Sequence, residues 1–156
     1  MYRTTMMTPI GELELVATET ALREVHFPGA PPSAVPAGQS PVLDEARGQL
    51  GEYFAGDRLQ FDLPIEPVGT AFQVMAWKAL CAIPFGATIS YGEQARRLGD
   101  GRKARAVGAA NGRNPLPIIV PCHRVVGANG HLTGFGGGMA CKAWLLEHEQ
   151  QVLALR

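Results

Sequence analysis

The sequence contains no apolar run that approaches the ~20 residues needed to cross a lipid bilayer. Its first residues, MYRTTMMTPIG, also lack the charged and then apolar pattern of a secretory signal peptide. We therefore expect a cytoplasmic protein with no membrane partner. Hydrophobic residues make up 46% of the 156 positions and charged residues 18%, so the chain has enough apolar material for a globular core.

Cysteine is scarce, because only Cys81, Cys122 and Cys141 are present and no CxxC spacing occurs. An odd number of cysteines argues against a disulfide framework and indicates a reducing compartment. The spacings of the three cysteines, taken together with His131 and His148, match no usual structural zinc pattern. We therefore expect no metal site.

Net charge is also absent from the chain as a whole, but the two halves differ. Residues 1–67 hold four arginines and ten acidic residues, a net charge of −6, whereas residues 68–156 hold ten basic and four acidic residues, a net charge of +6. We expect a domain boundary between these two ranges. The asymmetry indicates an anionic partner for the second domain, although ordinary surface charge explains it equally well.

The first domain combines strands with one helix. Residues 2–27 alternate apolar and polar side chains and are predicted to form antiparallel strands. A Pro/Gly-rich loop follows at 28–41, and then apolar residues at helical spacing predict a helix that stops at Gly56. Residues 60–69 are predicted to form a short strand and then a linker.

The second domain is predicted to be mainly helical. Residues 72–83 place apolar side chains on one helical face, and another helix begins near Met139. Cys81 and Cys141 fall on the apolar faces of these helices, which predicts inert, structural cysteines.

Two short helices are expected between these longer ones. Ser90 is a good N-cap residue, and Glu93 three positions later predicts a capping box for a helix over 91–98. A second short helix is predicted over 103–111, after a turn that contains glycine. Two short helices joined by such a turn have the outline of a helix-turn-helix, although many helical hairpins share it.

The stretch NPLPIIVPCHRVV, residues 114–126, carries the clearest chemistry. Its apolar run IIV is typical of a buried strand. Cys122 is nucleophilic only as the thiolate, so a base such as the adjacent His123 must take its proton, and a carboxylate such as Glu147 or Glu149 must orient the histidine. A buried, unreactive cysteine remains the alternative at this point.

Arg105 and Asn114 have two interpretations each. Arg105 is flanked by Ala104, Ala106 and Gly108, small residues that allow a helix to approach a surface closely while one long cation projects from it. A helix packed on the protein core, with a solvated arginine, fits the same pattern. Asn114 is either a site residue or a turn residue that bonds nearby backbone groups.

These segments together resemble one family. NPLPIIVPCHRVVG, the upstream ISYGE and ARAVGAANGRNP, and the downstream LTGFGGG and WLLEHE are similar to motifs of the O6-alkylguanine-DNA alkyltransferases. The resemblance is close over residues 69–149 and extends to the first 67 residues only in their layout.

The resemblance implies an α+β fold with two domains: a small N-terminal α/β domain with an antiparallel sheet and a mainly helical C-terminal domain with a winged-helix-like helix-turn-helix. It implies a monomer that docks this element in the minor groove of double-stranded DNA carrying O6-alkylguanine and flips the damaged base into a pocket. The alkyl group then moves irreversibly to the protein's own cysteine, once, without a cofactor.

The resemblance also implies individual roles. Cys122 would accept the alkyl group, His123 would draw off its proton through water, and Glu149 would orient the histidine. Tyr91 would contact N3 of the base and help guanine leave, and Arg105 would fill the gap left by the flipped base. The other implied contacts are Ala104, Ala106 and Gly108 to DNA and, around the substrate pocket, Asn114, Pro117, Val125, Phe135, Gly136 and Lys142.

Some features depart from the family pattern or leave alternatives. Phe135 and Gly136 stand where some members have tyrosine and serine, and cysteines matching the zinc site of some members are missing. The alternatives are an alkyltransferase-like protein that binds the lesion without repairing it, an alkylation-sensing regulator, and a cysteine hydrolase that ignores DNA. O4-alkylthymine is a possible second substrate.

Overall fold

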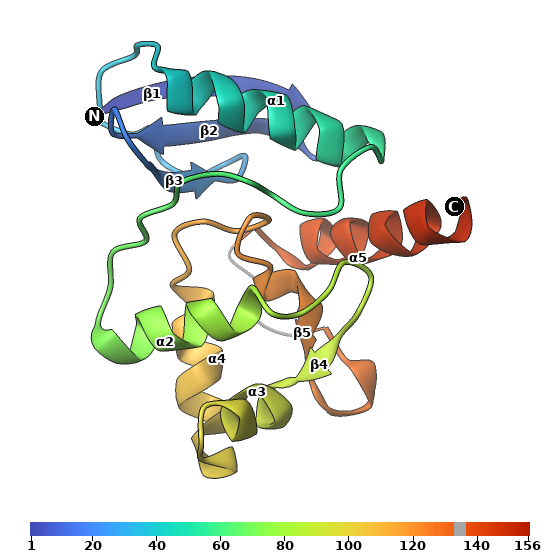
Figure 1. Ribbon diagram of the computed structural model, residues 1–156. Helices are drawn as coiled ribbons and strands as arrows, with labels where there is room; N and C mark the ends of the chain where they lie inside the picture. Colours follow the sequence, from blue (N-terminus) through green and yellow to red (C-terminus); the bar gives the residue numbers. More distant parts are fainter. Residues whose placement is uncertain (133–136) are drawn as a thin grey trace. The chain divides into compact units, whose positions relative to one another are not determined.

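The structure, a computed structural model, describes residues 1–132 and 137–156. The chain divides into two compact units, Met1–Val68 and Gly69–Arg156, and Figure 1 shows their elements. The boundary expected after residue 67 lies one residue before this division. The expected α+β class is confirmed, because the first unit contains an antiparallel sheet and the second is mainly helical.

The first unit is a three-stranded antiparallel sheet with a helix on one face (Figure 1). Strands β1 (Tyr2–Thr8), β2 (Gly11–Ala17) and β3 (Leu22–His26) pair in the order β1-β2-β3. In β2, Leu13 and Leu15 are buried while Glu12 and Glu14 are more exposed, because successive residues point to opposite faces of a sheet, but Val16 and Ala17 at its end are both buried.

Helix α1 (Pro41–Ala55) begins and ends where its sequence directs. The Ser40 hydroxyl accepts a hydrogen bond from the backbone N–H of Leu43 at 3.1 Å, which satisfies one of the free N–H groups of the first turn. Gly56 ends the helix in a left-handed conformation, φ +84°, which glycine adopts without a steric penalty.

The strand predicted within residues 60–69 is wrong. The structure has only a single bridge there, between Ile65 and Leu22. Leu22 donates to the carbonyl of Pro64 and accepts from Glu66, but Pro64 and Pro67 have no N–H group to continue a ladder.

The second unit consists of four helices of 7 to 16 residues, three 3₁₀ turns and a two-residue parallel pair of strands in the described residues (Figure 1). In chain order it contains α2 (Ala71–Leu80), β4 (Ile89–Ser90), α3 (Tyr91–Arg97), the 3₁₀ turn η1 (Gly101–Lys103), α4 (Ala104–Gly112), the 3₁₀ turn η2 (Cys122–Arg124), β5 (Val125–Val126), the 3₁₀ turn η3 (Ala128–Gly130) and α5 (Met139–Ala154). Residues 89 and 125 pair, as do 90 and 126.

Buried hydrogen bonds hold α2, α3 and α4 together. The indole N–H of Trp77 in α2 donates to the carbonyl of Ala110 in α4 at 2.8 Å. The buried amides of Gln94 in α3 and Asn111 in α4 bond each other twice, at 2.8 and 3.0 Å, and Gln94 also donates to the carbonyl of Ala76. Because each of these buried polar side chains finds its partner on another helix, they specify how α2, α3 and α4 pack together.

The capping of these helices differs in part from the prediction. Ser90 caps α3 by accepting from the N–H of Glu93, but the Glu93 carboxylate pairs with Arg96 and Arg97 rather than completing a capping box. The full capping box occurs instead at α2, between Thr70 and Gln73.

Cys81 and Cys141 also differ from the prediction. Cys81 is exposed at the C-terminal end of α2, not on its apolar face, and Cys141 in α5 is half-buried. Helical spacing located both residues on helices, but it did not show where α2 ends.

Candidate functional site

The segment that carries Cys122 is buried but is not a strand. Residues Leu116 to Val126 are buried, yet residues 116–121 form turns that lead into the 3₁₀ turn η2, and only Val125–Val126 are in a strand, so the strand predicted for the run IIV is wrong. Ile118 has a φ of +74°, a conformation that β-branched residues rarely adopt. This strained turn reverses the chain before Pro121 and brings Cys122 to the start of η2.

Asn114 holds the ends of this turn together. Its Nδ2 donates to the carbonyl of Val120 at 2.8 Å, and its Oδ1 accepts from the N–H of Leu116 at 2.9 Å. The N–H of Cys122 donates to the same Val120 carbonyl at 2.8 Å. Asn114 therefore acts on the position of Cys122 through one shared acceptor.

His123 and Glu149 form a buried pair. Nε2 of His123 lies 2.7 Å from Oε2 of Glu149, and both side chains are almost completely buried. Burial by itself raises the pKa of Glu149, but hydrogen bonds from His123 and Arg124 outweigh it and hold this pKa well below its usual range. The carboxylate is therefore ionised and can only accept, so Nε2 of His123 carries the proton that is shared with it.

The other ring nitrogen of His123 is consequently an acceptor. Among the described residues, Nδ1 is buried without a hydrogen-bond partner. Burial lowers the pKa of His123, and the charges of Arg124 and Lys142 lower it further, while Glu149 acts in the opposite direction. A neutral imidazole with an acceptor at Nδ1 can take a proton from a nearby thiol.

Opposing effects act on the pKa of the Cys122 thiol. Its residue is only 7% exposed, and burial raises the pKa of the thiol. A hydrogen bond from the Asn114 side chain and the positive charge of Lys142 both lower it. Deprotonation of this thiol therefore depends on its polar neighbours.

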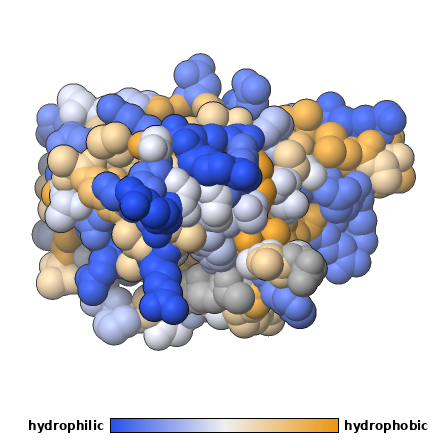
Figure 2. Space-filling model, turned by 90° about the horizontal axis from the view of Figure 1, so that it is seen from below, coloured by the Kyte–Doolittle hydropathy of each residue, from blue (hydrophilic) through white to orange (hydrophobic). Residues whose placement is uncertain are grey.

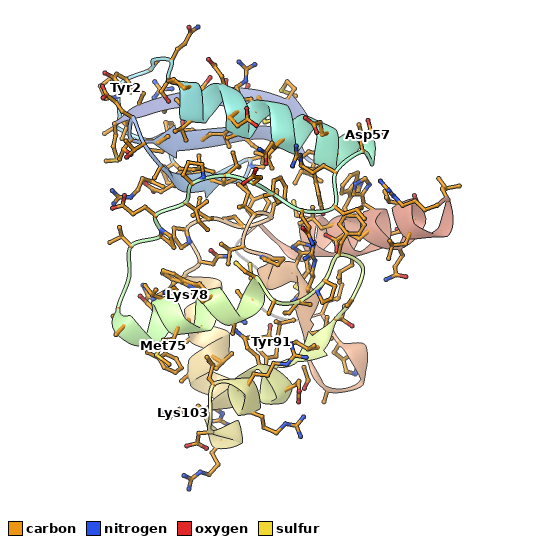
Figure 3. The ribbon with its side chains drawn as sticks, viewed as in Figure 1. Tyr2, Asp57, Met75, Lys78, Tyr91 and Lys103 are labelled. Carbon is orange, nitrogen blue, oxygen red and sulfur yellow. The ribbon has the colours of Figure 1, made fainter. Side chains whose placement is uncertain are left out.

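Lys142 and Tyr91 lie together next to this centre. Lys142 in α5 is fully buried, its pKa is lowered by burial, and its Nζ lies 5.9 Å from the centre of the Tyr91 ring. Tyr91 begins α3, where Figure 3 labels it. A Cβ added to Gly108 of α4 would lie 3.7 Å from the Tyr91 ring, so the first turn of α3 borders the helix-turn-helix surface.

The remaining predicted pocket residues divide into two groups. Pro117 and Val125 are buried on either side of Cys122 in the chain, and Val125 pairs with Ile89 in the two-stranded sheet. Phe135 and Gly136 lie outside the described residues.

Arg105 projects from a different part of the unit. It lies in the first turn of α4 and is exposed, as is Ala106, while Ala104 and Gly108 are half-buried. The opposite face of α4 buries Val107, Ala110 and Asn111. Small side chains therefore lie beside the exposed Arg105, an arrangement that fits both of its interpretations.

The surface around α3 and η1 is rich in cations. Figure 2 shows strongly hydrophilic side chains beside hydrophobic ones on this side of the molecule. The exposed basic residues of the helix-turn-helix are Arg96, Arg97, Arg102, Lys103, Arg105 and Arg113. The ion pairs found within this set in the described structure join Arg96 and Arg97 to Glu93, and Arg102 to Asp100.

Sequence reasoning did not assign two parts of this site. Arg124 contacts both oxygens of Glu149 at 2.9 Å, and the N–H of Gly86 donates to Oε1 of Glu149 at 3.0 Å. Because Arg124 is adjacent to His123 in the sequence, its presence at this site could have been predicted. No sequence signal pointed to Gly86, which lies 63 residues from Glu149.

Two further properties bear on the class of protein. Within residues 1–132 and 137–156, no group of three or more His, Cys, Asp or Glu side chains could hold a metal ion. No helix in the same residues is long and apolar enough to cross a membrane.

Fold and site together define a class: a two-unit α+β protein with a basic helix-turn-helix and a buried cysteine followed by a histidine–glutamate pair. Two family models match the chain. The DNA-binding domain of 6-O-methylguanine DNA methyltransferase matches residues 71–151, and the ribonuclease-like domain of the same protein matches residues 1–67. The chain therefore belongs to the 6-O-methylguanine DNA methyltransferase family, and the resemblance seen in its sequence is confirmed.

Individual relatives agree with this assignment. The chain is 45% identical over 153 residues to a methylated-DNA–protein-cysteine methyltransferase of Methanosarcina acetivorans, covering 96% of this chain and 98% of that protein. It is 47% identical over 152 residues to the protein of the same name in Mycobacterium tuberculosis, covering 96% and 92%. It is also similar to the crystal structure of Mycobacterium tuberculosis OGT in complex with DNA, with 43% identity, 97% and 94% coverage and a TM-score of 0.92.

Proposed function

We propose that this protein repairs DNA by transferring an alkyl group, typically methyl, from O6-alkylguanine to the sulfur of Cys122. The observation that carries the proposal is the buried centre in which Cys122 is followed by a His123–Glu149 pair 2.7 Å apart. The names of its relatives and the DNA complex of one of them support the same reaction class.

The reaction follows from these groups. The Cys122 proton passes through water to Nδ1 of His123, while Glu149 stabilises the imidazolium that forms. The thiolate then attacks the alkyl carbon, an S–C bond forms, the C–O6 bond breaks, and its electron pair stays on the guanine. Proton donation by the Tyr91 hydroxyl towards N3 stabilises the leaving base.

The product is an S-alkylcysteine, which has no easy return to the thiol. Each molecule therefore acts once, and no cofactor takes part. Asn114, Pro117, Val125 and Lys142 border the base. The family resemblance implies the same role for Phe135 and Gly136, which lie outside the described residues.

DNA is bound through the outer face of α4. Ala104, Ala106 and Gly108 allow this helix to lie close to the minor groove, and Arg105 enters the duplex to occupy the place of the flipped base. The minor groove gives little sequence information, which suits a protein that must find a lesion in any context. We expect a monomer, located in the cytoplasm.

The proposal is tested by incubating the protein with duplex DNA containing O6-methylguanine and digesting it for peptide mass analysis. The peptide with Cys122 should gain one methyl group, with a yield of one per protein. Cys122→Ala should lose transfer but still bind the duplex, because the thiol supplies chemistry rather than docking. Cys141→Ala, a half-buried cysteine in α5, is the matched control and should transfer normally.

Each rival gives a different result. A protein that only binds the lesion would retain the duplex without a mass change, and a cysteine hydrolase would turn over repeatedly without needing DNA. Methyl transfer to another residue in Cys122→Ala would contradict the assignment of the acceptor.

A further inference from the structure

Arg124 follows His123 directly in the chain, and its guanidinium forms two hydrogen bonds with the carboxylate of Glu149. Nε of Arg124 lies 2.9 Å from Oε1, and Nη2 lies 2.9 Å from Oε2. The pair is bidentate, and the two side chains are only 7% and 1% exposed. Consecutive residues of one short turn, His123 and Arg124, therefore share a single carboxylate.

Contacts with the loop at 83–86 also fix the position of the guanidinium. Nη1 of Arg124 donates to the carbonyl of Ile83 at 2.7 Å, and Cζ lies 5.6 Å from the centre of the Phe85 ring. Gly86 of the same loop donates its N–H to Oε1 of Glu149. The orientation of the carboxylate is thus defined by the loop at 83–86 as well as by η2, and a lysine could not reproduce these contacts because it has a single nitrogen.

The charges around His123 also balance through Arg124. The ionisable groups that act on the imidazole are Glu149 and Lys142 from α5 and Arg124 from η2, and the Cys122 thiol precedes it in the same turn. Without Arg124, the buried Glu149 carboxylate would face His123 uncompensated. The pair would then take up a proton more readily, because a buried, unpaired negative charge is strongly unfavourable.

We infer that Arg124 is a positioning residue for the proton relay that His123 and Glu149 form. It fixes both oxygens of Glu149 and balances their charge, so that His123 is neutral and its Nδ1 is an acceptor. This inference rests on the proposed roles of His123 and Glu149. Arg124 acts through Glu149 and touches neither the thiol proton nor the alkyl carbon.

The test separates the charge of Arg124 from its geometry. Arg124→Met removes both, and Arg124→Lys keeps the charge but loses the planar group that makes two hydrogen bonds to Glu149. Glu147→Gln is a matched control on the exposed side of α5. Single-turnover transfer from free O6-benzylguanine is measured from pH 5.5 to 9.5, so that DNA binding does not enter. The protonation of His123 is followed separately by ¹⁵N NMR of the imidazole, assigned with a His123→Gln variant.

In Arg124→Met we expect the His123–Glu149 pair to take up a proton at a higher pH, by at least about one unit. Protonated Nδ1 cannot accept, so the acidic limb of the rate profile moves to higher pH by the same amount. In Arg124→Lys the limb stays near that of the unmodified protein, while the plateau rate falls about tenfold because the carboxylate is misaligned. Glu147→Gln should change neither.

A rate profile and a His123 titration that both remain unchanged in Arg124→Met would overturn the inference, even if that variant melts at a lower temperature. If Arg124→Met does not fold, Arg124→Lys decides, and a plateau rate equal to that of the unmodified protein counts against the inference. Glu149→Gln tests the relay itself: normal transfer in this variant would refute the roles of His123 and Glu149. Slow transfer in Glu149→Gln together with an unchanged rate profile in Arg124→Met would support the roles of His123 and Glu149 and show that Arg124 has no part in positioning them.

Discussion

Asn114 and Cys122 donate hydrogen bonds to the same acceptor, the carbonyl oxygen of Val120, both at 2.8 Å. The turn between them contains Ile118 in a left-handed conformation. Residues held in such rare conformations persist only where the surrounding structure compensates for the strain. The Asn114 side chain supplies part of that compensation, so Cys122 is positioned by a residue eight places before it.

Asn114→Ala should therefore lower both stability and transfer. It leaves the buried N–H of Leu116 without its acceptor, at a cost of about 1–3 kcal/mol, while the Val120 carbonyl still receives the N–H of Cys122. Chemical denaturation and transfer from free O6-benzylguanine measure the two effects. Asn114→Asp keeps the acceptor for Leu116 but places a negative charge near the thiol, so it should lose rate more than stability. Unchanged denaturation of Asn114→Ala would contradict this account of the turn.

Arg105→Ala should slow repair in duplex DNA by about tenfold to a hundredfold. Extruding a base costs a few kcal/mol, and each 1.4 kcal/mol that the arginine no longer offsets is a factor of ten in rate. Reaction with free O6-benzylguanine should hardly change, because no base needs to be flipped. Arg105→Lys keeps the charge without the planar group, so its rate of repair in duplex DNA should lie between those of the unmodified protein and Arg105→Ala. An equal loss on both substrates would mean that Arg105 supports the fold of α4 instead.

Acid should destabilise the protein through His123 and Glu149. The pKa of each is lowered in the folded state from ordinary values of 6.5 and 4.5, so the unfolded chain binds protons more readily than the folded one. The stabilisation is therefore complete above about pH 6.5 and is lost progressively as the pH falls, first through His123 and then, below about pH 4.5, also through Glu149. Urea unfolding at a series of pH values measures it.

Two variants of α5 separate this effect from general acid denaturation. Glu149→Gln should flatten the part of the curve below about pH 4.5, because its side chain cannot be protonated there. Glu147→Gln alters an exposed carboxylate two residues away and should leave the curve unchanged. Identical curves for the two variants would show that the buried pair does not control acid stability.

Alkylation of Cys122 should destabilise the protein. A methyl or benzyl group must be accommodated at a residue that is 7% exposed, and overpacking a buried site typically costs about 1–3 kcal/mol. For a chain of this size, each kcal/mol corresponds to roughly 2–4 °C in Tm. Thermal melts of free, methylated and benzylated protein should show a decrease that grows with the group, with reagent-treated Cys122→Ala as the control. A Tm that is equal or higher after alkylation would indicate a roomy site.

The local sequence predicted the presence of the helices and singled out the segment around Cys122, but it did not give every helix boundary. Gly56, which ends α1, and Ser90, which caps α3, were both predicted from the hydrogen-bonding and backbone preferences of single residues, whereas the cap at Ser40 was not. The motif around Cys122 located the cysteine and histidine because they are neighbours in the chain. Where such local rules were applied to the run IIV and to residues 60–69, they predicted strands that the folded chain does not have.

Those two errors have a common cause. A strand exists only if another strand pairs with it, and apolar composition says nothing about whether a partner is present. At 60–69 the prolines prevent pairing beyond one bridge, and at Ile118 the backbone turns instead of extending.

The partners of His123 could not be chosen from the sequence either. Glu147 and Glu149 are both close to the end of the chain and both lie in α5, but residues two apart point to different sides of a helix, and which side faces η2 depends on how α5 packs. Composition and short motifs determine which residues can form helices and which can react. The pairing of Glu149 with His123, Arg124 and Gly86, from 25 to 63 residues away, arises only when distant elements are brought together in one buried core.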